Sequence, residues 1–321
     1  MEVRNLGRSG LRVSAVGLGC NNIGGRCDFD ASRAVVHSAL DHGITLFDTA
    51  NVYPRTDRGR SEEYLGRILG ERRKEIVLAT KVGIPMDNGR LSGLSRRTVI
   101  ASVEESLRRL GTDWIDLYQL HRFDPLTPIE ETLRALDDLV RQGKVRYLGL
   151  SRFAAWQVVD AVWMARAGGL APLVSCQDEY SLLAREPDLG LLDAMAAQGL
   201  GMLPYFPLAS GLLTGKYRRN APMPGGARLA YTPDLSGHFV TEHNWAVLER
   251  LERFCATRGR TLLELAFSWL LARPTVASVI AGATRPEQVA GNVAATGWAL
   301  RAEELAEVDA ITAPMRPVPA P

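Results

Sequence analysis

Short runs of β-branched and apolar residues alternate with longer amphipathic segments along nearly the whole chain. The runs, which predict eight strands, occur at residues 13–19, 44–48, 75–80, 115–120, 145–150, 173–177, 200–206 and 276–281. The amphipathic segments between most of them predict helices. Strands separated by helices pair in parallel, and eight such units predict an α/β protein closed as a (β/α)8 TIM barrel.

Two of the predicted helices have clear start signals. Residues 96–110 follow Ser95, whose hydroxyl can cap the first turn. Residues 128–142 follow Thr127, which we expect to cap the helix with proline at its first position. A glycine comes directly after each segment, as is typical of the left-handed residue that ends many helices.

Three segments lie outside this alternation. Residues 2–12 predict a small hairpin that turns at residues 8–10 and plugs the bottom of the barrel. Residues 218–240, rich in Pro, Gly and Arg, predict a long loop over the opposite, C-terminal face. The Pro-rich tail at 314–321 is expected to be frayed. With no tandem repeat and no long linker, residues 1–321 are expected to form one barrel domain.

The main alternative fold is an open, doubly wound sheet. Such a sheet would carry GxGxxG after its first strand, but residues 17–25 read GLGCNNIGG, with Asn22 in place of the third glycine. Residues 211–217, GLLTGKY, also miss the phosphate-loop pattern. Neither nucleotide-binding motif is present, which favours the barrel.

Composition narrows the class of protein. The chain has 321 residues, with 46% apolar and 23% charged side chains, as expected of a globular protein. Its 38 Lys and Arg against 36 Asp and Glu leave a net charge of +2, which argues against nucleic acid as a partner. No apolar run reaches about 18 residues, and the N-terminus has no apolar signal core, so no membrane association is expected. Four cysteines without metal spacing indicate reduced thiols, a cytoplasmic location and no metal site.

Reactive side chains follow the predicted strands, at the end where a barrel builds its active site. Asp48 ends the second strand, and Tyr53 follows five residues later. Lys81 follows the third strand, and His121 follows the fourth. On residue types alone, Asp48 and Lys81 fit a structural ion pair as well as a catalytic one. Their placement on neighbouring strand ends favours a chemical unit.

The chemistry of these four residues suits proton transfer to a carbonyl oxygen. A phenol has a pKa of about 10, and an ammonium within ~4 Å would lower that pKa by roughly 2–3. Asp48 would keep Lys81 charged and in place, and His121 would orient the substrate oxygen. Tyr53 would then donate a proton as an oxyanion develops. Carbonyl reduction needs this from a protein when a nicotinamide supplies the hydride.

The ordered motifs of the chain resemble those of the aldo-keto reductase family. They are VSAVGLG at 13–19, then FDTANVY, TKVG, DLYQLH, GLS, QDEYSLL and YFPLASGLLTGKY, and finally GATRPEQVAGN at 282–292. The resemblance implies an NAD(P)(H)-dependent oxidoreductase that interconverts a small carbonyl compound and an alcohol on a TIM barrel. It places the catalytic roles on Asp48, Tyr53, Lys81 and His121.

The resemblance also implies a cofactor site. Ser151, Arg152 and Gln177 would bind the carboxamide, Tyr205 would stack on the nicotinamide, residues 206–216 would hold the pyrophosphate, and 282–292 the adenosine phosphate. The residues that it assigns to the cofactor are Cys20, Asn21, Asp48, Ser151, Arg152, Gln177, Tyr205, Phe206, Pro207, Leu208, Ser210, Gly211, Leu213, Lys216, Arg218, Gly282, Thr284, Arg285, Gln288 and Asn292.

Two departures from the family pattern bear on the cofactor and on the function. Residues 282–283, Gly-Ala, replace the Lys-Ser pair that grips the 2′-phosphate in mammalian-type relatives, so Thr284 and Arg285, with Lys216 or Arg218, would bind it instead. An arginine suits a phosphate, which favours NADP(H) over NAD(H). Many relatives have Asn at the position of Arg152, and the arginine here is similar to that of potassium-channel beta subunits and some bacterial members.

Two other functions remain open at this stage. One is an NADPH-binding, redox-sensing regulatory subunit with little turnover, which the similarity at Arg152 motivates. The other is an aldolase or isomerase in which Lys81 forms a Schiff base. The sequence leaves the physiological substrate, the direction of the reaction and the oligomeric state open.

Overall fold

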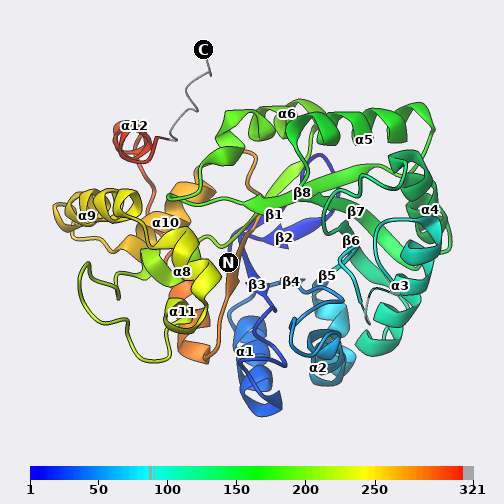
Figure 1. Cartoon of the computed structure of the whole chain (residues 1–321), viewed down its shortest axis with the longest axis horizontal. Coiled ribbons are helices and arrows are strands. Elements are labelled where there is room, and N and C mark those ends of the chain that lie inside the picture. The colour runs from blue at the N-terminus through cyan, green and yellow to red at the C-terminus, as the bar shows by residue number, and fades with distance from the viewer. Residues whose placement is uncertain (87–88, 90, 314–321) are drawn as a thin grey trace.

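The computed structural model describes residues 1–86, 89 and 91–313, and within them eight parallel strands form a barrel at the centre of the molecule (Figure 1). In spatial order, these strands are β10 (Val279–Gly282), β3 (Val16–Gly19), β4 (Leu46–Asp48), β5 (Val77–Val82), β6 (Ile115–Leu120), β7 (Val145–Ser151), β8 (Leu173–Glu179) and β9 (Gly201–Tyr205). Next to β10, Met202 N donates a hydrogen bond to Thr275 O at 2.7 Å, and Ala277 N donates to Met202 O at 2.9 Å. These bonds nearly close the barrel, so the predicted fold is confirmed.

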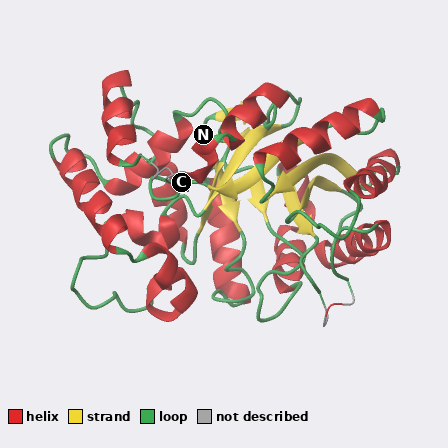
Figure 2. Cartoon of the chain, turned by 45° about the horizontal axis from the view of Figure 1, so that its top comes forward, coloured by secondary structure: helices red, strands yellow, loops and turns green. Residues whose placement is uncertain are grey.

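Helices surround the strands on the outside (Figure 2). They are α1 (Phe29–Asp41), α2 (Arg60–Leu69), α3 (Arg96–Leu110), α4 (Ile129–Arg141), α5 (Ala155–Ala167), α6 (Leu191–Gln198), α9 (Glu242–Ala256), α10 (Leu262–Leu271), α11 (Pro286–Ala294) and α12 (Ala302–Ile311). The main apolar core lies between helices and strands, and a second cluster includes Leu46, Ala79, Leu117 and Leu203 of the strands. None of the described helices is both long and apolar enough to cross a bilayer.

The two expected helix caps have different outcomes. Ser95 caps α3 as predicted, because its Oγ accepts a hydrogen bond from Thr98 N at 3.3 Å. The Thr127 cap is wrong: Pro128 occupies the capping position of α4, and the Thr127 hydroxyl donates to Asp124 Oδ2 at 2.7 Å. That carboxylate also accepts from the backbone amides of Leu126 and of Leu94, which lies before α3, so it holds the hydroxyl away from the helix.

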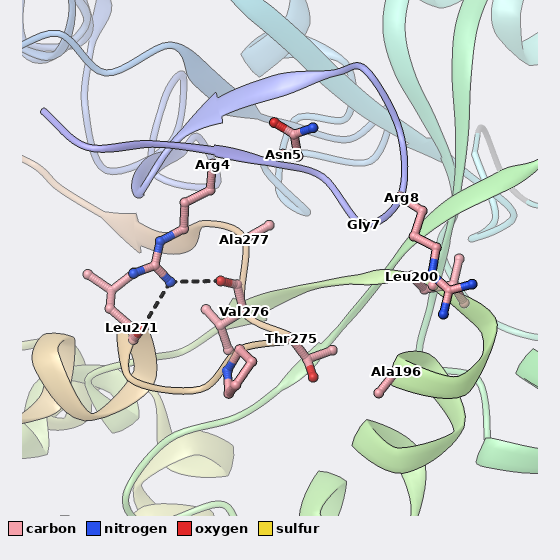
Figure 3. Close-up of a pocket in the computed structure, with 12 residues that line it drawn as sticks. Arg4, Asn5, Gly7, Arg8, Ala196, Leu200, Leu271, Thr275, Val276 and Ala277 are labelled. Carbon is pink, nitrogen blue, oxygen red and sulfur yellow. Dashed lines mark hydrogen bonds between the residues drawn. The ribbon is translucent and has the colours of Figure 1, made fainter. Parts of the chain in front are cut away.

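The N-terminal hairpin is present at the bottom of the barrel. It pairs β1 (Val3–Asn5) with β2 (Arg12–Ser14), so the predicted strand 13–19 is in fact divided between the hairpin and β3. Arg4 fixes the hairpin to the last part of the chain, donating to Leu271 O at 2.9 Å and Val276 O at 3.0 Å (Figure 3). Its turn lies so close to the barrel that a Cβ on Gly7 would come within 2.5 Å of the carbonyl oxygen of Gly199.

The prediction of one long loop at 218–240 is wrong in part. This segment contains two short helices, α7 (Arg228–Tyr231) and α8 (Pro233–Phe239). Leu229 and Phe239 are buried against the core, and this packing stabilises the two helices. The high Pro and Gly content of the segment gave no indication of it. The predicted fraying of 314–321 lies outside the described residues.

Candidate functional site

The carboxyl ends of three neighbouring strands bring the predicted reactive residues together. Asp48 is the last residue of β4, Lys81 lies near the end of β5, and His121 follows β6 directly. The parallel register pairs Asp48 with Ala79 and Lys81 with Gln119, so all of these residues lie at one end of the barrel. Tyr53 enters from the loop after β4.

Lys81 and Asp48 form a buried ion pair. The Nζ atom of Lys81 is 2.6 Å from Asp48 Oδ2 and donates a second hydrogen bond to Thr49 O at 2.9 Å. Burial acts to lower the pKa of Lys81, but the Asp48 carboxylate, with Tyr53, outweighs it and raises that pKa above its usual value. The side chain is therefore a permanent ammonium at neutral pH, which is unsuitable for forming a Schiff base.

Two glutamines hold the other carboxylate oxygen. Gln119 Nε2 donates to Asp48 Oδ1 at 3.0 Å, and Gln177 Nε2 donates to the same atom at 2.9 Å. Gln177 was predicted at the cofactor, whereas Gln119 was not predicted. The signal for Gln119 was the alternation along β6, which places a fully buried amide on the same face as Leu117 and His121.

Tyr53 and His121 lie next to this ion pair. Their rings meet edge to face, with centroids 5.8 Å apart, and Lys81 Nζ is 5.2 Å from the centroid of the Tyr53 ring. The pKa of His121 is well below its ordinary value, first because of burial and then because of Lys81 and surrounding arginines. Its Nδ1 is buried with no hydrogen-bond partner among the described residues. The imidazole is therefore neutral at pH 7 and has an unsatisfied nitrogen.

The ends of β7, β8 and β9 place the expected nicotinamide residues at the same end of the barrel. Ser151 is buried, whereas Arg152 is exposed and has a left-handed backbone with φ of 57°. The Arg152 amide donates to Gln177 O at 3.1 Å, which joins the ends of β7 and β8. Tyr205 is half-buried, and burial raises the pKa of its phenol.

The chain after Tyr205 has an unusual backbone. Phe206, Ala209 and Ser210 all have positive φ, although none of them is glycine, and Gly211 follows with φ of 100°. Such strained residues concentrate at functional sites, and consecutive turns of this kind direct backbone N–H groups toward an anion. The hydroxyl of Ser210 is buried and has no partner among the described residues. This segment, η4 (Ala209–Thr214) with the residues before it, therefore fits a phosphate group.

The other residues of this loop have structural contacts. Leu208 O accepts hydrogen bonds from Gly211 N at 2.8 Å and from Leu213 N at 3.2 Å, and Pro207 is buried. Arg218, expected at the cofactor phosphate, instead pairs with Glu252 at 3.0 Å.

Three cations gather beside this loop. Burial lowers the pKa of Lys216, and Arg26 and Arg285 lower it further, which places the three positive charges within electrostatic range of one another. In the part of the chain that the structure describes, no carboxylate is among the groups that shift this pKa. Arg26 was not predicted, because it lies in the loop after β3, far from Lys216 and Arg285 in the sequence.

The remaining cofactor candidates follow β3 and β10 in the chain, and two of them lie on α11. Gln288 Oε1 accepts from Thr284 N at 2.7 Å, and Asn292 is buried on α11. A Cβ on Gly282 would lie 3.4 Å from Asn21 Oδ1. Cys20 is buried, and its amide donates to Asp48 O at 2.9 Å.

Comparison with known proteins identifies relatives along almost the whole chain. A model of the Aldo/keto reductase family matches residues 15–313. The chain is 38% identical to L-glyceraldehyde 3-phosphate reductase of Escherichia coli K12, covering 96% of this chain and 92% of the relative. It is 38% identical to an uncharacterized oxidoreductase of Bacillus subtilis, covering 95% and 94%. A probable voltage-gated potassium channel subunit beta of Arabidopsis thaliana is 37% identical, with 92% and 91% covered.

Proposed function

This chain belongs to the aldo/keto reductase family, and on that premise we propose that it is an NADP(H)-dependent oxidoreductase that reduces aldehydes or ketones to alcohols, or catalyses the reverse reaction. The observation that carries this proposal is the fully buried Lys81–Asp48 pair beside the Tyr53 ring. The pair provides a fixed positive charge next to the Tyr53 phenol, at the end of the barrel where (β/α)8 enzymes have their active sites.

In the proposed mechanism, Tyr53 donates the proton that the carbonyl oxygen takes up. Lys81 already directs hydrogen bonds to Asp48 and Thr49, so its third N–H is available to stabilise the phenolate that Tyr53 becomes. His121, being neutral, donates a hydrogen bond that orients the same oxygen. When bound, the nicotinamide cofactor supplies the hydride for the carbonyl carbon. In the reverse direction, the phenolate accepts the proton from the alcohol.

A phenylalanine at position 53 tests this mechanism. We expect Tyr53→Phe to lower kcat by at least about 100-fold, because it removes the proton donor, while NADPH binding measured by fluorescence stays within about threefold of wild type. A variant that keeps most of its activity would contradict the assignment. If the wild-type chain binds NADPH tightly and reduces no aldehyde in a broad panel, it is a regulatory subunit, as the name of the Arabidopsis relative indicates for that protein.

The preference for NADP(H) is supported by the cations beside η4. Arg26, Lys216 and Arg285 supply positive charge where the 2′-phosphate would be held. We expect Arg285→Leu to weaken NADPH binding by about 10- to 100-fold and to change NADH binding little, since a charge-assisted hydrogen bond contributes about 1.5–3 kcal/mol. Equal losses for both cofactors would place Arg285 elsewhere in the site and contradict this role.

The substrate is proposed to be a small aldehyde that carries an anionic group. Positive charges from three arginines, Arg55, Arg122 and Arg152, each contribute to the low pKa of His121. The same charges would therefore act on a substrate whose carbonyl oxygen is bound by His121. The E. coli relative is named for a phosphorylated aldehyde, which agrees with this charge. We expect Arg122→Gln to raise KM for glyceraldehyde 3-phosphate about tenfold and to leave KM for glyceraldehyde unchanged. A parallel change in both KM values would argue against anion recognition.

A further inference from the structure

Tyr53 lies on the segment that connects β4 to α2, residues 50–60 (Figure 1). We call this segment the Tyr53 loop. Its tip, residues 55–58, is exposed, whereas Tyr53 is half-buried beside the Lys81–Asp48 pair. An exposed loop tip has few contacts that hold it in place, so the position of Tyr53 relative to Lys81 depends on how the base of the loop is held.

A side-chain hydrogen bond closes the base of the Tyr53 loop. Thr49 directly precedes the loop and Ser61 directly follows it, and their hydroxyl oxygens are 2.9 Å apart. Ser61 Oγ also donates a hydrogen bond to Cys20 O at 2.9 Å. A hydroxyl has one proton, and Ser61 gives its proton to that carbonyl, so Thr49 is the donor in the bond between the two hydroxyls. All three residues are fully buried, which shields these bonds from water.

The same serine holds the backbone of Tyr53. Ser61 lies in the first turn of α2, where backbone amides have no partner within the helix. Its amide donates to Tyr53 O at 3.0 Å, so the position of the Tyr53 backbone follows that of Ser61. The Ser61 hydroxyl in turn fixes the start of α2 to the residues that follow β3 and β4, which are Cys20 and Thr49.

Thr49 also belongs to the surroundings of Lys81. Its carbonyl oxygen accepts the hydrogen bond that Lys81 Nζ donates at 2.9 Å, and its amide donates to Ala79 O at 2.8 Å. Lys81 is thus attached to the carbonyl of Thr49, and Ser61 to its hydroxyl. A short chain of hydrogen bonds therefore runs from the Lys81 ammonium through Thr49 and Ser61 to the backbone of Tyr53.

We propose that Ser61 is a positioning residue that sets the distance between Tyr53 and the Lys81 ammonium, an inference that rests on the proposed role of Tyr53 as proton donor. Without the Ser61 hydroxyl, the Thr49 hydroxyl and Cys20 O would be buried without this partner, which is unfavourable, so the start of α2 would shift or admit water. Tyr53 would shift with it, and a displacement of about 1 Å can lower a reaction rate about 100-fold.

Hydrogen exchange tests whether Ser61 holds the loop, without reference to activity. In Ser61→Ala, we expect the amides of peptides that cover the Tyr53 loop to exchange at least about tenfold faster than in wild type, measured by mass spectrometry. Thr49→Val removes the same bond from the other side and should give the same increase, also if Ser61→Ala folds poorly. Exchange that is unchanged in both variants would overturn the proposal.

A matched control comes from a serine on the neighbouring helix α3. Ser102 is also buried, but its hydroxyl has no hydrogen-bond partner among the described residues. Ser102→Ala therefore removes the same atom from a similar environment without breaking a bond. We expect it to leave both the exchange of the Tyr53 loop and the turnover as in wild type.

Steady-state kinetics test whether Ser61 acts through Tyr53. We expect Ser61→Ala to lower kcat about tenfold and to change the KM values for NADPH and glyceraldehyde 3-phosphate less than about twofold. In the Tyr53→Phe background, Ser61→Ala is expected to cause no further loss, because no phenol is left to position. An equal loss in both backgrounds would show a purely structural effect and overturn the proposal.

The outcomes separate this inference from the proposed function. If Tyr53→Phe keeps most of its activity, the proposed mechanism fails, and the exchange data alone decide whether Ser61 holds the loop. If Tyr53→Phe loses its activity while Ser61→Ala and Thr49→Val keep theirs, the mechanism stands and the positioning role of Ser61 is overturned.

Discussion

Replacing Asp48 by asparagine removes the charge that stabilises the buried ammonium of Lys81. The new amide would have to keep its oxygen toward the donors Gln119 and Gln177, which both bind Oδ1. Its NH2 group would then face Lys81 Nζ, so two donors would meet where the structure has a 2.6 Å ion pair. The variant therefore loses an attraction and gains a repulsive contact.

The size of the effect follows from the geometry of the pair. Coulomb's law at 2.6 Å, with an effective dielectric of about 20, gives roughly 6 kcal/mol of attraction before the cost of desolvation. Removing one partner of a buried pair typically costs about 3–5 kcal/mol, because the other charge stays buried without compensation. We therefore expect Asp48→Asn to lower the free energy of unfolding by about 3–5 kcal/mol.

Urea denaturation of a double-mutant cycle checks this value. Lys81→Met removes the ammonium, and we expect Asp48→Asn and Lys81→Met together to destabilise less than the sum of the single changes by at least about 2 kcal/mol. In Asp48→Asn, no carboxylate opposes the effect of burial, so the pKa of Lys81 falls. As pH rises, the ammonium and with it the residual activity are therefore expected to be lost at a lower pH than in wild type. An Asp48→Asn protein within about 0.5 kcal/mol of wild type would refute the reasoning.

Three further changes test other parts of the structure. Gln119→Leu removes one donor to the Asp48 carboxylate, and we expect the free energy of unfolding measured by urea denaturation to fall by about 1–3 kcal/mol, together with a reduced kcat. Burial raises the pKa of Asp178 to about 6, so between about pH 4 and 6 this carboxyl holds a proton in the folded protein that the unfolded chain has lost. The free energy of unfolding therefore falls as pH rises through this range. In Asp178→Asn this decline in urea-denaturation midpoints should disappear. Gly7→Ala introduces a Cβ 2.5 Å from a backbone carbonyl at φ of 59° and should lower Tm by several degrees, whereas Gly10→Ala, whose nearest contact is at 4.0 Å, should not.

The barrel could be predicted because its signals are local and repeated. Each β/α unit has an apolar run and an amphipathic segment, and parallel pairing with right-handed connections fixes their order. The boundary at Ser14 could not be predicted, since the chain passes from the hairpin into β3 within one continuous apolar run. The helices at 228–239 were missed because their burial depends on distant core residues and not on their own composition.

The candidate site was predictable only where the chemistry follows strand ends. Asp48, Lys81 and His121 were found in this way, and the structure brings them together. Gln119 and Arg26 were not found, because an amide within a strand and an arginine in a loop have no meaning until the fold places them beside a carboxylate or other cations.

The burial of the Lys81–Asp48 pair itself argues for chemistry over stability. A buried ion pair is a weak source of stability, since apolar side chains of similar volume in its place are often neutral or stabilising. Here the pair has two additional amide donors on one carboxylate oxygen, and it lies at the barrel end that also holds a neutral His121. In a site of low dielectric, a fixed positive charge stabilises a developing phenolate far more than it would in water. The arrangement therefore makes physical sense as a permanent charge maintained for Tyr53.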